Sequence, residues 1–512
     1  MVANLGGMAK AKATFRCTEC GATYPKWVGQ CRTCRAWGTI EEDVPVVGAG
    51  GAGAAPVTPA TPALPIGQVD AQAARARTTG VSELDRVLGG GIVPGAVVLL
   101  AGEPGIGKST LLLDVAAKAA AQARAGSGGR RSRAGGARGA EGADSLGAGD
   151  AGHGGDDGSG VPFAGVAGPV LYVTGEESAS QVRLRAERIG ALDDALLLAA
   201  ENDLARALGH VEAHSPSLLV VDSVQTLASP DEEGAPGGVA QVRAVTAALI
   251  AVAKQRNIPV LLVGHVTKTG GIAGPRVLEH LVDVVLQFEG DRHARLRLLR
   301  AVKNRYGPTD EVGCFELGDH GIVGLEDPSG LFLSQTSQRV PGTCVTVTLE
   351  GRRPMPTEVQ ALVAKSTAGS PRRTTSGVDH SRVAMILAVL QARMGVDLGS
   401  CDVYASTVGG ARTAEPAADL ALAMSILSAA CDAAPKERLV AVGEVSLTGE
   451  VRQSVGVERR LAEAARLGFK FAIVPAAALD GLRIPSGMTV RGVKDLAEAA
   501  RLALPEAAGP NP

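Results

Sequence analysis

The segment from Gly102 to Ser109, Gly-Glu-Pro-Gly-Ile-Gly-Lys-Ser, constrains the fold more than any other part of the chain. It matches the pattern G-x-x-x-x-G-K-[ST] in full, follows the apolar residues 97–101 and opens a helical pattern at Thr110. Glycines let backbone N–H groups surround phosphates, and a helix N-terminus adds partial positive charge. A chance match is the alternative in a chain with 67 glycines, but the flanking strand and helix favour a nucleotide-phosphate loop.

This loop predicts ATP and Mg²⁺ as cofactors. Lys108 would bridge the β- and γ-phosphates, and the Ser109 hydroxyl would ligate Mg²⁺. The predicted nucleotide-binding residues of the loop are Gly102, Glu103, Pro104, Gly105, Ile106, Gly107, Lys108, Ser109 and Thr110.

Acidic residues follow two further apolar runs. Leu218-Leu-Val-Val-Asp222 ends in a carboxylate that we expect to hold Mg²⁺, although an acid that merely caps a strand is the alternative. Glu176 and Glu177 follow the run 170–173, and strand ends at one edge of a parallel sheet converge on the ligand. We predict Glu176 as the general base, with Glu177 as the alternate and solvent-facing acids in a turn as the competing interpretation.

The order of apolar runs and helical patterns along the chain predicts an α/β fold. A length of 512 residues predicts more than one domain. From about residue 66, short apolar runs (97–101, 170–173, 218–221, 259–263, 282–288) alternate with helical patterns, which indicates a mostly parallel sheet covered on both faces. Residues 125–168 are rich in Gly, Ala, Arg and Asp, and we expect a disordered surface insertion. The predicted ATPase core is 66–333, followed by a third unit over 334–505 and a tail over 506–512.

Four of the eight cysteines are clustered as Cys17-x-x-Cys20 and Cys31-x-x-Cys34. Two thiolate pairs on tight turns suit tetrahedral Zn²⁺, and four thiolates leave no open position for a substrate, so the site would be structural. Disulfides are the alternative, which a cytoplasmic location disfavours. We expect a zinc ribbon over 14–42 and a flexible linker over 43–65.

The net charge and the hydropathy of the sequence limit the classes of partner that the protein can have. The formal charge of −2 excludes a globally basic coat for nucleic acid, so any DNA contact must come from a local patch or an assembled channel. No apolar run approaches the roughly 20 residues of a membrane span, and the first residues lack the order of a secretory signal. We expect a cytoplasmic protein with no membrane partner.

Several further motifs resemble the RadA (Sms) family. They are the run that begins at Thr79-Gly-Val-Ser-Glu-Leu-Asp85, the segments Gly264-His-Val-Thr-Lys-Thr-Gly270 and Gly274-Pro-Arg-Val-Leu-Glu-His280, and Lys303-Asn-Arg-Tyr-Gly307. The last segment is similar to the family signature KNRFG, with Tyr306 in place of Phe. The resemblance implies a RecA-like P-loop core between an N-terminal zinc ribbon and a C-terminal Lon protease-like domain.

The same resemblance implies a function. It is a homo-oligomeric, hexameric ring that translocates on single-stranded DNA and drives branch migration of recombination intermediates with the RecA recombinase. Glu176 then corresponds to the water-activating acid and His265 to a γ-phosphate sensor. Lys303 and Arg305 would be catalytic basic fingers that reach a neighbour's nucleotide or the DNA, with a solvated basic turn as the alternative. The Gly-rich residues 267–276 would line the bore and contact phosphates.

The resemblance to Lon raises the question of proteolysis. Alignment on the Lon motifs places Ala417 at the nucleophile position and Glu458 at the lysine position. Alanine has no nucleophilic atom and glutamate cannot act as a low-pKa amine, so we expect no protease activity. The domain would instead support ring assembly and offer a basic outer face, with candidate DNA contacts at Arg352, Arg353, Lys365, Arg372 and Arg373.

Two rival functions remain beside the DNA-stimulated ATPase. One is an ATP-dependent peptidase, which Ala417 and Glu458 disfavour. The other is a non-enzymatic scaffold or phosphotransfer ring on the same core, which the complete set Lys108, Ser109, Asp222 and Glu176 disfavours.

Overall fold

The computed structural model describes the chain in segments that fall into two compact units, Met1–Asp70 and Ala71–Pro512. The described residues are 14–17, 22–24, 26, 28–37, 40–43, 65–68, 71–133, 161–163, 168–265, 278–290, 295–318, 321–334, 340–367 and 370–505. None of the helices within these segments has the length and apolar character that crossing a bilayer requires.

The first unit is a small antiparallel sheet. Its strands are β1 (Thr14–Cys17), β2 (Thr23–Tyr24) and β3 (Ile40–Asp43), in the order β2-β1-β3. Cys17 and Cys31 are buried at its centre, where Tyr24 and Val28 pack against them. With so few apolar residues, this unit has little hydrophobic core of its own.

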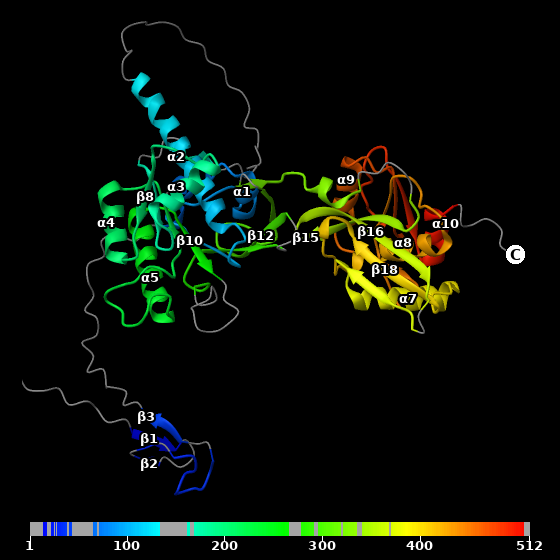
Figure 1. The fold of residues 1–512 in the computed structure, drawn as a ribbon, viewed down its shortest axis with the longest axis horizontal. Coiled ribbons are helices and arrows are strands. Elements are labelled where there is room, and N and C mark those ends of the chain that lie inside the picture. The colour runs from blue at the N-terminus through cyan, green and yellow to red at the C-terminus, as the bar shows by residue number, and fades with distance from the viewer. Residues whose placement is uncertain are drawn as a thin grey trace, which may run out of the picture. The chain divides into compact units, whose positions relative to one another are not determined.

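The second unit contains a nine-stranded sheet in the order β14-β13-β12-β11-β5-β10-β9-β7-β8 (Figure 1). From β11 to β8 neighbouring strands are parallel, whereas β12, β13 and β14 are antiparallel additions. The strands are β5 (Val97–Gly102), β7 (Val170–Thr174), β8 (Leu196–Ala200), β9 (Leu218–Asp222), β10 (Val260–His265), β11 (Val284–Glu289), β12 (Leu296–Asn304), β13 (Val312–Gly318) and β14 (Gly321–Gly324).

Helices cover both faces of this sheet because its central strands are apolar on both sides. One face packs against α1 (Ser82–Leu88), α2 (Lys108–Arg133) and α3 (Ala179–Arg188). The other packs against α4 (Leu204–His214) and α5 (Val239–Arg256). The predicted α/β fold with a mostly parallel, doubly covered sheet is therefore confirmed.

The structure describes residues at both ends of the insertion that was predicted over 125–168. The helix α2 continues to Arg133, beyond the predicted start of the insertion at residue 125. At the other end, β6 (Val161–Pro162) pairs with β4 (Arg77–Thr78). Phe163 is fully buried, with the Arg77 guanidinium 5.9 Å from its ring centroid. Residues 134–160 and 164–167 lie outside the described residues.

A seven-stranded sheet follows in the order β17-β18-β16-β15-β19-β22-β23. Its strands are β15 (Thr343–Glu350), β16 (Arg353–Lys365), β17 (Arg373–Ser376), β18 (Cys401–Thr407), β19 (Leu439–Ala441), β22 (Phe471–Pro475) and β23 (Thr489–Val493), beside the hairpin of β20 (Glu444–Val445) and β21 (Val451–Arg452). The accompanying helices are α6 (Ser329–Phe332), α7 (His380–Met394), α8 (Asp419–Cys431), α9 (Val457–Arg466) and α10 (Leu496–Ala503). The helix α8 is buried along most of its length at the centre of this layer.

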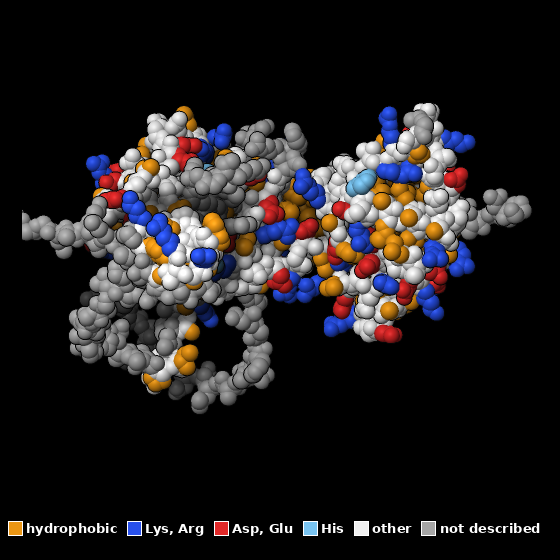
Figure 2. All heavy atoms as spheres, turned by 90° about the horizontal axis from the view of Figure 1, so that it is seen from below, with side chains coloured by type: hydrophobic (Ala, Val, Ile, Leu, Met, Phe, Trp, Pro, Cys, Tyr) orange, Lys and Arg blue, Asp and Glu red, His pale blue; other side chains and the backbone are white. Residues whose placement is uncertain are grey.

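Short 3-10 turns complete the assignment. They are η1 (Ile66–Gln68), η2 (Gln72–Ala74), η4 (Val408–Gly410), η5 (Pro416–Ala418) and η6 (Ala476–Ala478). On the face in Figure 2, Lys and Arg side chains are interspersed with Asp and Glu, in keeping with the near-neutral formal charge.

Candidate nucleotide-binding site

The phosphate loop connects the end of β5 to the first turn of α2. Gly105 and Gly107 adopt φ values of 79° and 110°, which side chains with a Cβ rarely adopt. A Cβ on Gly107 would also lie 2.4 Å from Ile322 Cδ1, so the Ile322 side chain would have to shift. The chain thus folds into a tight loop that presents backbone N–H groups at a helix N-terminus, as a phosphate ligand requires.

Lys108 lies at the centre of the loop with its side chain buried. Its Nζ donates to the backbone carbonyls of Gly102 at 2.9 Å and Glu103 at 3.0 Å. Burial lowers the pKa of Lys108 to about 8, against the opposing effect of the charges on Asp222 and Glu176. A phosphate group beside this ammonium would restore the charged form, so the loop is prepared for an anion.

Asp222 ends β9 and is buried. Tyr172 donates its phenolic proton to Asp222 Oδ2 at 2.6 Å, whereas Oδ1 is buried without a hydrogen-bond partner among the described residues. A carboxylate oxygen left unsatisfied in this way is costly. It fits Mg²⁺ or a water of its coordination shell, and the Ser109 hydroxyl in the first turn of α2 is the second ligand of the predicted magnesium site.

The two candidate acids after β7 have different partners. Glu176 Oε1 accepts from the Ser223 hydroxyl at 2.8 Å and lies 3.0 Å from His265 Nε2. His265 is the main cause that lowers the pKa of Glu176 to about 2, and Ser223 adds to this effect against burial. Glu177 instead pairs with Arg185 on α3. The structure therefore brings Glu176, and not Glu177, beside His265 and the end of β9.

Strand register explains why these groups meet. His265 pairs with Gly102 across β10 and β5, and Thr174 pairs with Asp222 across β7 and β9. The carboxyl ends of four parallel strands are therefore level at one edge of the sheet, which is where ligands bind in folds of this kind. Tyr172 and Ser223 are functional neighbours that sequence reasoning missed. A tyrosine inside the otherwise apolar strand β7 was the only signal for the first.

The basic pentapeptide lies at the opposite edge of the same sheet. Asn304 pairs with Val284, and Val284 pairs with Val98 near the start of β5. Lys303 Nζ donates to the carbonyls of Glu279 and Val282, both at 2.8 Å. Because β5 rises about 3.3 Å per residue, the pentapeptide is on the order of 17 Å from the phosphate loop of its own subunit.

Asn304 and Gly307 fix this turn against α1. The Asn304 side chain donates to the carbonyl of Leu88 at 3.3 Å, and a Cβ on Gly307 would lie 3.0 Å from the same oxygen. The Gly-rich residues 267–276, predicted to contact DNA, lie outside the described residues. Glu279 and Val282, whose carbonyls accept from Lys303, follow these residues in the sequence.

A cluster of thiols forms the candidate metal site of the first unit. The Sγ atoms of Cys17, Cys31 and Cys34 lie within 4.8 Å of one another, and those of Cys17 and Cys34 are 3.6 Å apart. A disulfide needs about 2.05 Å, whereas two ligands of a tetrahedral zinc ion with about 2.3 Å bonds are about 3.8 Å apart. The three thiols therefore fit zinc, and Cys20, the fourth predicted ligand, lies outside the described residues.

The positions aligned with the Lon dyad carry no nucleophile–base pair. Ala417 is buried in η5, and Glu458 is exposed on α9 with Arg483 at 3.5 Å. Two residues from these positions along the chain, the fully buried Arg460 pairs with Glu415 and donates to the Val347 carbonyl at 2.6 Å.

One expected DNA contact is wrong. Arg353 was placed on a basic outer face, but its side chain is buried and pairs with Glu83 of α1. It also donates to the backbone carbonyls of Leu325 and Glu326, at 2.9 and 2.8 Å. Its neighbour Arg352 is exposed beside Asp310. Arg353 is the first residue of β16, whereas Arg352 lies in the turn before it, so the two side chains have different surroundings.

Comparisons with known proteins agree with this arrangement. Family models match for a rubredoxin metal binding domain over residues 15–42, an AAA domain over residues 154–271 and subunit ChlI of Mg-chelatase over residues 348–478. A solved structure of the RadB recombinase matches with 21% identity over 49% of this chain and 99% of that chain, at a TM-score of 0.33.

Curated relatives cover almost the whole chain. The DNA repair protein RadA of Mycolicibacterium smegmatis is 49% identical over 94% of this chain and 96% of its own length. DNA repair protein RadA of Bacillus subtilis is 41% identical over 97% of this chain and 100% of its own length. The chain therefore belongs to the RadA family of DNA repair proteins and has a P-loop ATPase core.

Proposed function

We propose that this protein is a motor that hydrolyses ATP when stimulated by DNA. The convergence of Lys108, Asp222, Glu176 and His265 at one edge of the sheet carries the proposal. Lys108 would hold the β- and γ-phosphates, and Ser109 with Asp222 would hold Mg²⁺. Water would attack the γ-phosphoryl group, and ADP would leave.

Glu176 would orient the attacking water. The contacts with His265 and Ser223 lower the pKa of Glu176 to about 2, so its carboxylate is ionised and can accept a hydrogen bond from the water. His265 lies between the ends of β5 and β9 and contacts Glu176 at 3.0 Å. A γ-phosphate that displaced this contact would be sensed by His265.

A comparison of Glu176→Gln with Glu177→Gln tests this assignment. We expect Glu176→Gln to keep ATP binding and to lose about 100-fold or more in kcat, a typical contribution of a group that handles the proton or the water. Glu177→Gln is the matched control, because Glu177 pairs with Arg185 on α3, and it should retain a kcat near wild type. Equal effects in the two variants would show that the wrong carboxylate has been chosen.

We propose that identical subunits assemble into a hexameric ring, in which the basic pentapeptide contacts a phosphate outside its own subunit. Lys303 and Arg305 lie on the order of 17 Å from their own phosphate loop, too far to contact their own nucleotide. A neighbouring subunit's nucleotide, or DNA in a central channel, is within reach only after assembly. A cation at such an interface stabilises charge that develops on the transferred phosphoryl group.

The DNA-related role extends the family assignment. We propose that the ring translocates on single-stranded DNA, acts on branched recombination intermediates and works with the RecA recombinase. Lys303→Ala and Arg305→Ala should spare ATP binding and reduce either hydrolysis or DNA handling. Mass photometry of the wild type with nucleotide gives the ring size, and strand exchange at the wild-type rate in both variants would remove the finger role.

The C-terminal layer is proposed to be proteolytically inactive. Ala417 and Glu458 supply neither a nucleophile nor a low-pKa amine, and the charged residues Glu415 and Arg460, each two positions away in sequence, are paired with each other. A casein degradation assay with ATP should give no cleavage, and ATP-dependent cleavage would revive the peptidase.

Zinc would be structural in the first unit. The three described thiols already lie at ligand distances, and a fourth from Cys20 would close the coordination shell. Because this unit has little apolar core, metal binding would supply its folding free energy.

A further inference from the structure

The carboxylate of Asp283 faces two cations at the amino edge of the main sheet. Asp283 immediately precedes β11, and its side chain is 6% exposed. Its Oδ2 accepts from the Val97 backbone N–H at 3.0 Å and from Lys254 Nζ at 2.7 Å. Its Oδ1 accepts from Arg305 Nη1 at 3.3 Å. One buried negative charge thus meets two positive charges, although one cation suffices to neutralise it.

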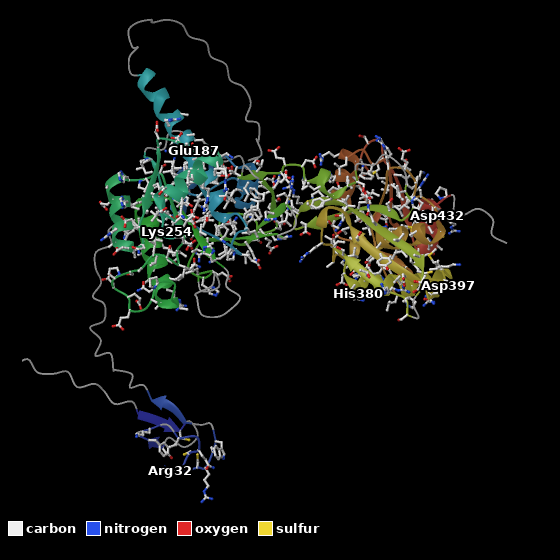
Figure 3. All side chains as sticks on the ribbon, in the orientation of Figure 1. Arg32, Glu187, Lys254, His380, Asp397 and Asp432 are labelled. Atoms are coloured by element: carbon white, nitrogen blue, oxygen red, sulfur yellow. The ribbon has the colours of Figure 1, made fainter. Side chains whose placement is uncertain are left out.

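The two cations are held differently. Lys254 comes from α5 (Figure 3) and also lies 3.3 Å from the Tyr306 hydroxyl. Arg305 has only its single, longer contact with Asp283 among the described residues, and its side chain is 57% exposed. Lys254 is therefore the firmly bound partner, and Arg305 is the one that can leave without stranding the carboxylate.

The electrostatics of Asp283 agree with this asymmetry. Burial would raise the pKa of Asp283, but hydrogen bonds from Lys254 and the Val97 N–H, with the charges of Lys254 and Arg305, bring it below its usual value. Burial would lower the pKa of Lys254, which its bond to Asp283 and its contact with Tyr306 instead raise. Both members of the pair are thus held in their charged forms.

The backbone under Arg305 is fixed independently of its guanidinium. The Arg305 N–H donates to the Asp283 carbonyl at 3.3 Å, and the next residue, Tyr306, donates its N–H to Asn304 Oδ1 at 2.9 Å. Release of the side chain from Asp283 therefore needs only rotamer changes, while the turn stays in place. An incoming phosphate offers this guanidinium two oxygens in place of one.

We propose that Asp283 and Lys254 are positioning residues that hold the Arg305 guanidinium in reserve and release it to a phosphate group. Lys254 keeps the buried carboxylate neutral when Arg305 leaves. The phosphate belongs either to a nucleotide bound by a second copy of this chain or to a DNA backbone. This inference rests on the proposed function for the identity of the phosphate, but the holding of Arg305 is a property of the isolated subunit.

The two positioning residues predict opposite effects on Arg305. Lys254→Met leaves Arg305 as the only described cation on Asp283, so the guanidinium is held more tightly. Asp283→Asn removes the negative charge, while its side-chain carbonyl can still accept from the Val97 N–H, so the guanidinium is released. If Asp283 and Lys254 had a purely structural role, the accessibility of the Arg305 guanidinium would change in the same direction in both variants.

Modification of Arg305 by phenylglyoxal, followed by mass spectrometry of the full chain, measures this release directly. Relative to wild type, we expect the rate at Arg305 to fall about two- to fivefold in Lys254→Met and to rise by a similar factor in Asp283→Asn, as for a partly exposed ion pair. Arg483, with a side chain 89% exposed, serves as the internal reference. Lys254→Arg should restore the wild-type rate.

Protection experiments separate the two phosphate sources. Wild-type protein is modified with a non-hydrolysable ATP analogue alone and, separately, with single-stranded oligonucleotide alone. Protection of Arg305 by the analogue in the assembled protein indicates a neighbour's nucleotide, and protection by the oligonucleotide indicates DNA. Protection by neither contradicts release to a phosphate.

Kinetics separate this inference from the proposed function. In Lys254→Met we expect at least a twofold loss of the stimulation of ATP hydrolysis by single-stranded DNA. A wild type without stimulation contradicts the proposed motor and leaves the modification rates as the test of the reserve position. An unchanged or faster modification rate at Arg305 in Lys254→Met overturns the inference, whatever the ATPase assay gives.

Discussion

Arg353→Met removes one partner of the buried pair that joins β16 to α1. Arg353 donates to Glu83 and to the carbonyls of Val312, Leu325 and Glu326. The Glu83 side chain is fully buried, so the variant leaves a carboxylate without its main counter-charge and removes the guanidinium from three carbonyls. Breaking a buried pair in this way costs about 3 to 5 kcal/mol.

Other contacts of Glu83 set the expected value near the lower end of that range. The Cys314 N–H still donates to Glu83 Oε2 at 2.7 Å, and Arg86 Nε remains 3.4 Å from Oε1. We therefore expect a loss of about 3 kcal/mol in the free energy of unfolding. At about 2 °C or more per kcal/mol for a large unit, Tm should fall by about 6 °C or more.

The neighbouring Arg352→Met is the matched control. Arg352 is exposed and lies 3.6 Å from Asp310 and 3.7 Å from Glu311, a surface arrangement worth less than about 1 kcal/mol. Adding Glu83→Gln to Arg353→Met removes the stranded charge and should recover at least about 1 kcal/mol. Equal Tm values for the two single variants in differential scanning calorimetry would refute the buried role of Arg353.

Three further predictions follow from the site and from the ends of the insertion. Because burial lowers the pKa of Lys108 to about 8, raising the pH through 8 should deprotonate Lys108 and weaken ATP binding, and calorimetry should show proton uptake on binding. A Kd for ATP that stays constant from pH 7 to 9 would contradict this. Purified protein should contain one zinc ion per chain, and the Cys31→Ser variant should lose this zinc and show altered fluorescence of the exposed Trp37. An unchanged zinc content in the variant would exclude the thiol site. Deletion of residues 134–160 should change kcat for ATP hydrolysis by no more than about twofold, because α2 and Phe163, which flank the deleted segment, are retained. A loss of activity would mean that the segment is structural.

Local motifs were enough to predict the nucleotide site. The phosphate loop, Asp222 and Glu176 each follow an apolar strand, and parallel topology brings strand ends together without knowledge of side-chain contacts. Glu176 stays the predicted base: its carboxylate contacts Ser223 and His265, whereas Glu177 pairs with Arg185. Tyr172 escaped prediction because its contact with Asp222 spans 50 residues and leaves no local pattern.

Burial of charged residues was the property that the sequence could not reveal. Arg352 and Arg353 are chemically alike, and only the pairing of Arg353 with Glu83, 270 residues earlier, separates a surface arginine from a buried one. The ends of the insertion were missed for a related reason. Low apolar content indicated disorder for the whole stretch, whereas the continuing helix α2 and one buried residue, Phe163, order its two ends.

The rate of ATP hydrolysis by the full, zinc-loaded chain, with and without single-stranded DNA, tests the central claim most directly. The proposed motor predicts hydrolysis that single-stranded DNA accelerates and that Lys108→Ala abolishes, because Lys108 lies at the centre of the phosphate loop. A wild type that neither binds nor hydrolyses ATP with any polynucleotide, or a Lys108→Ala variant with the wild-type kcat, would contradict it.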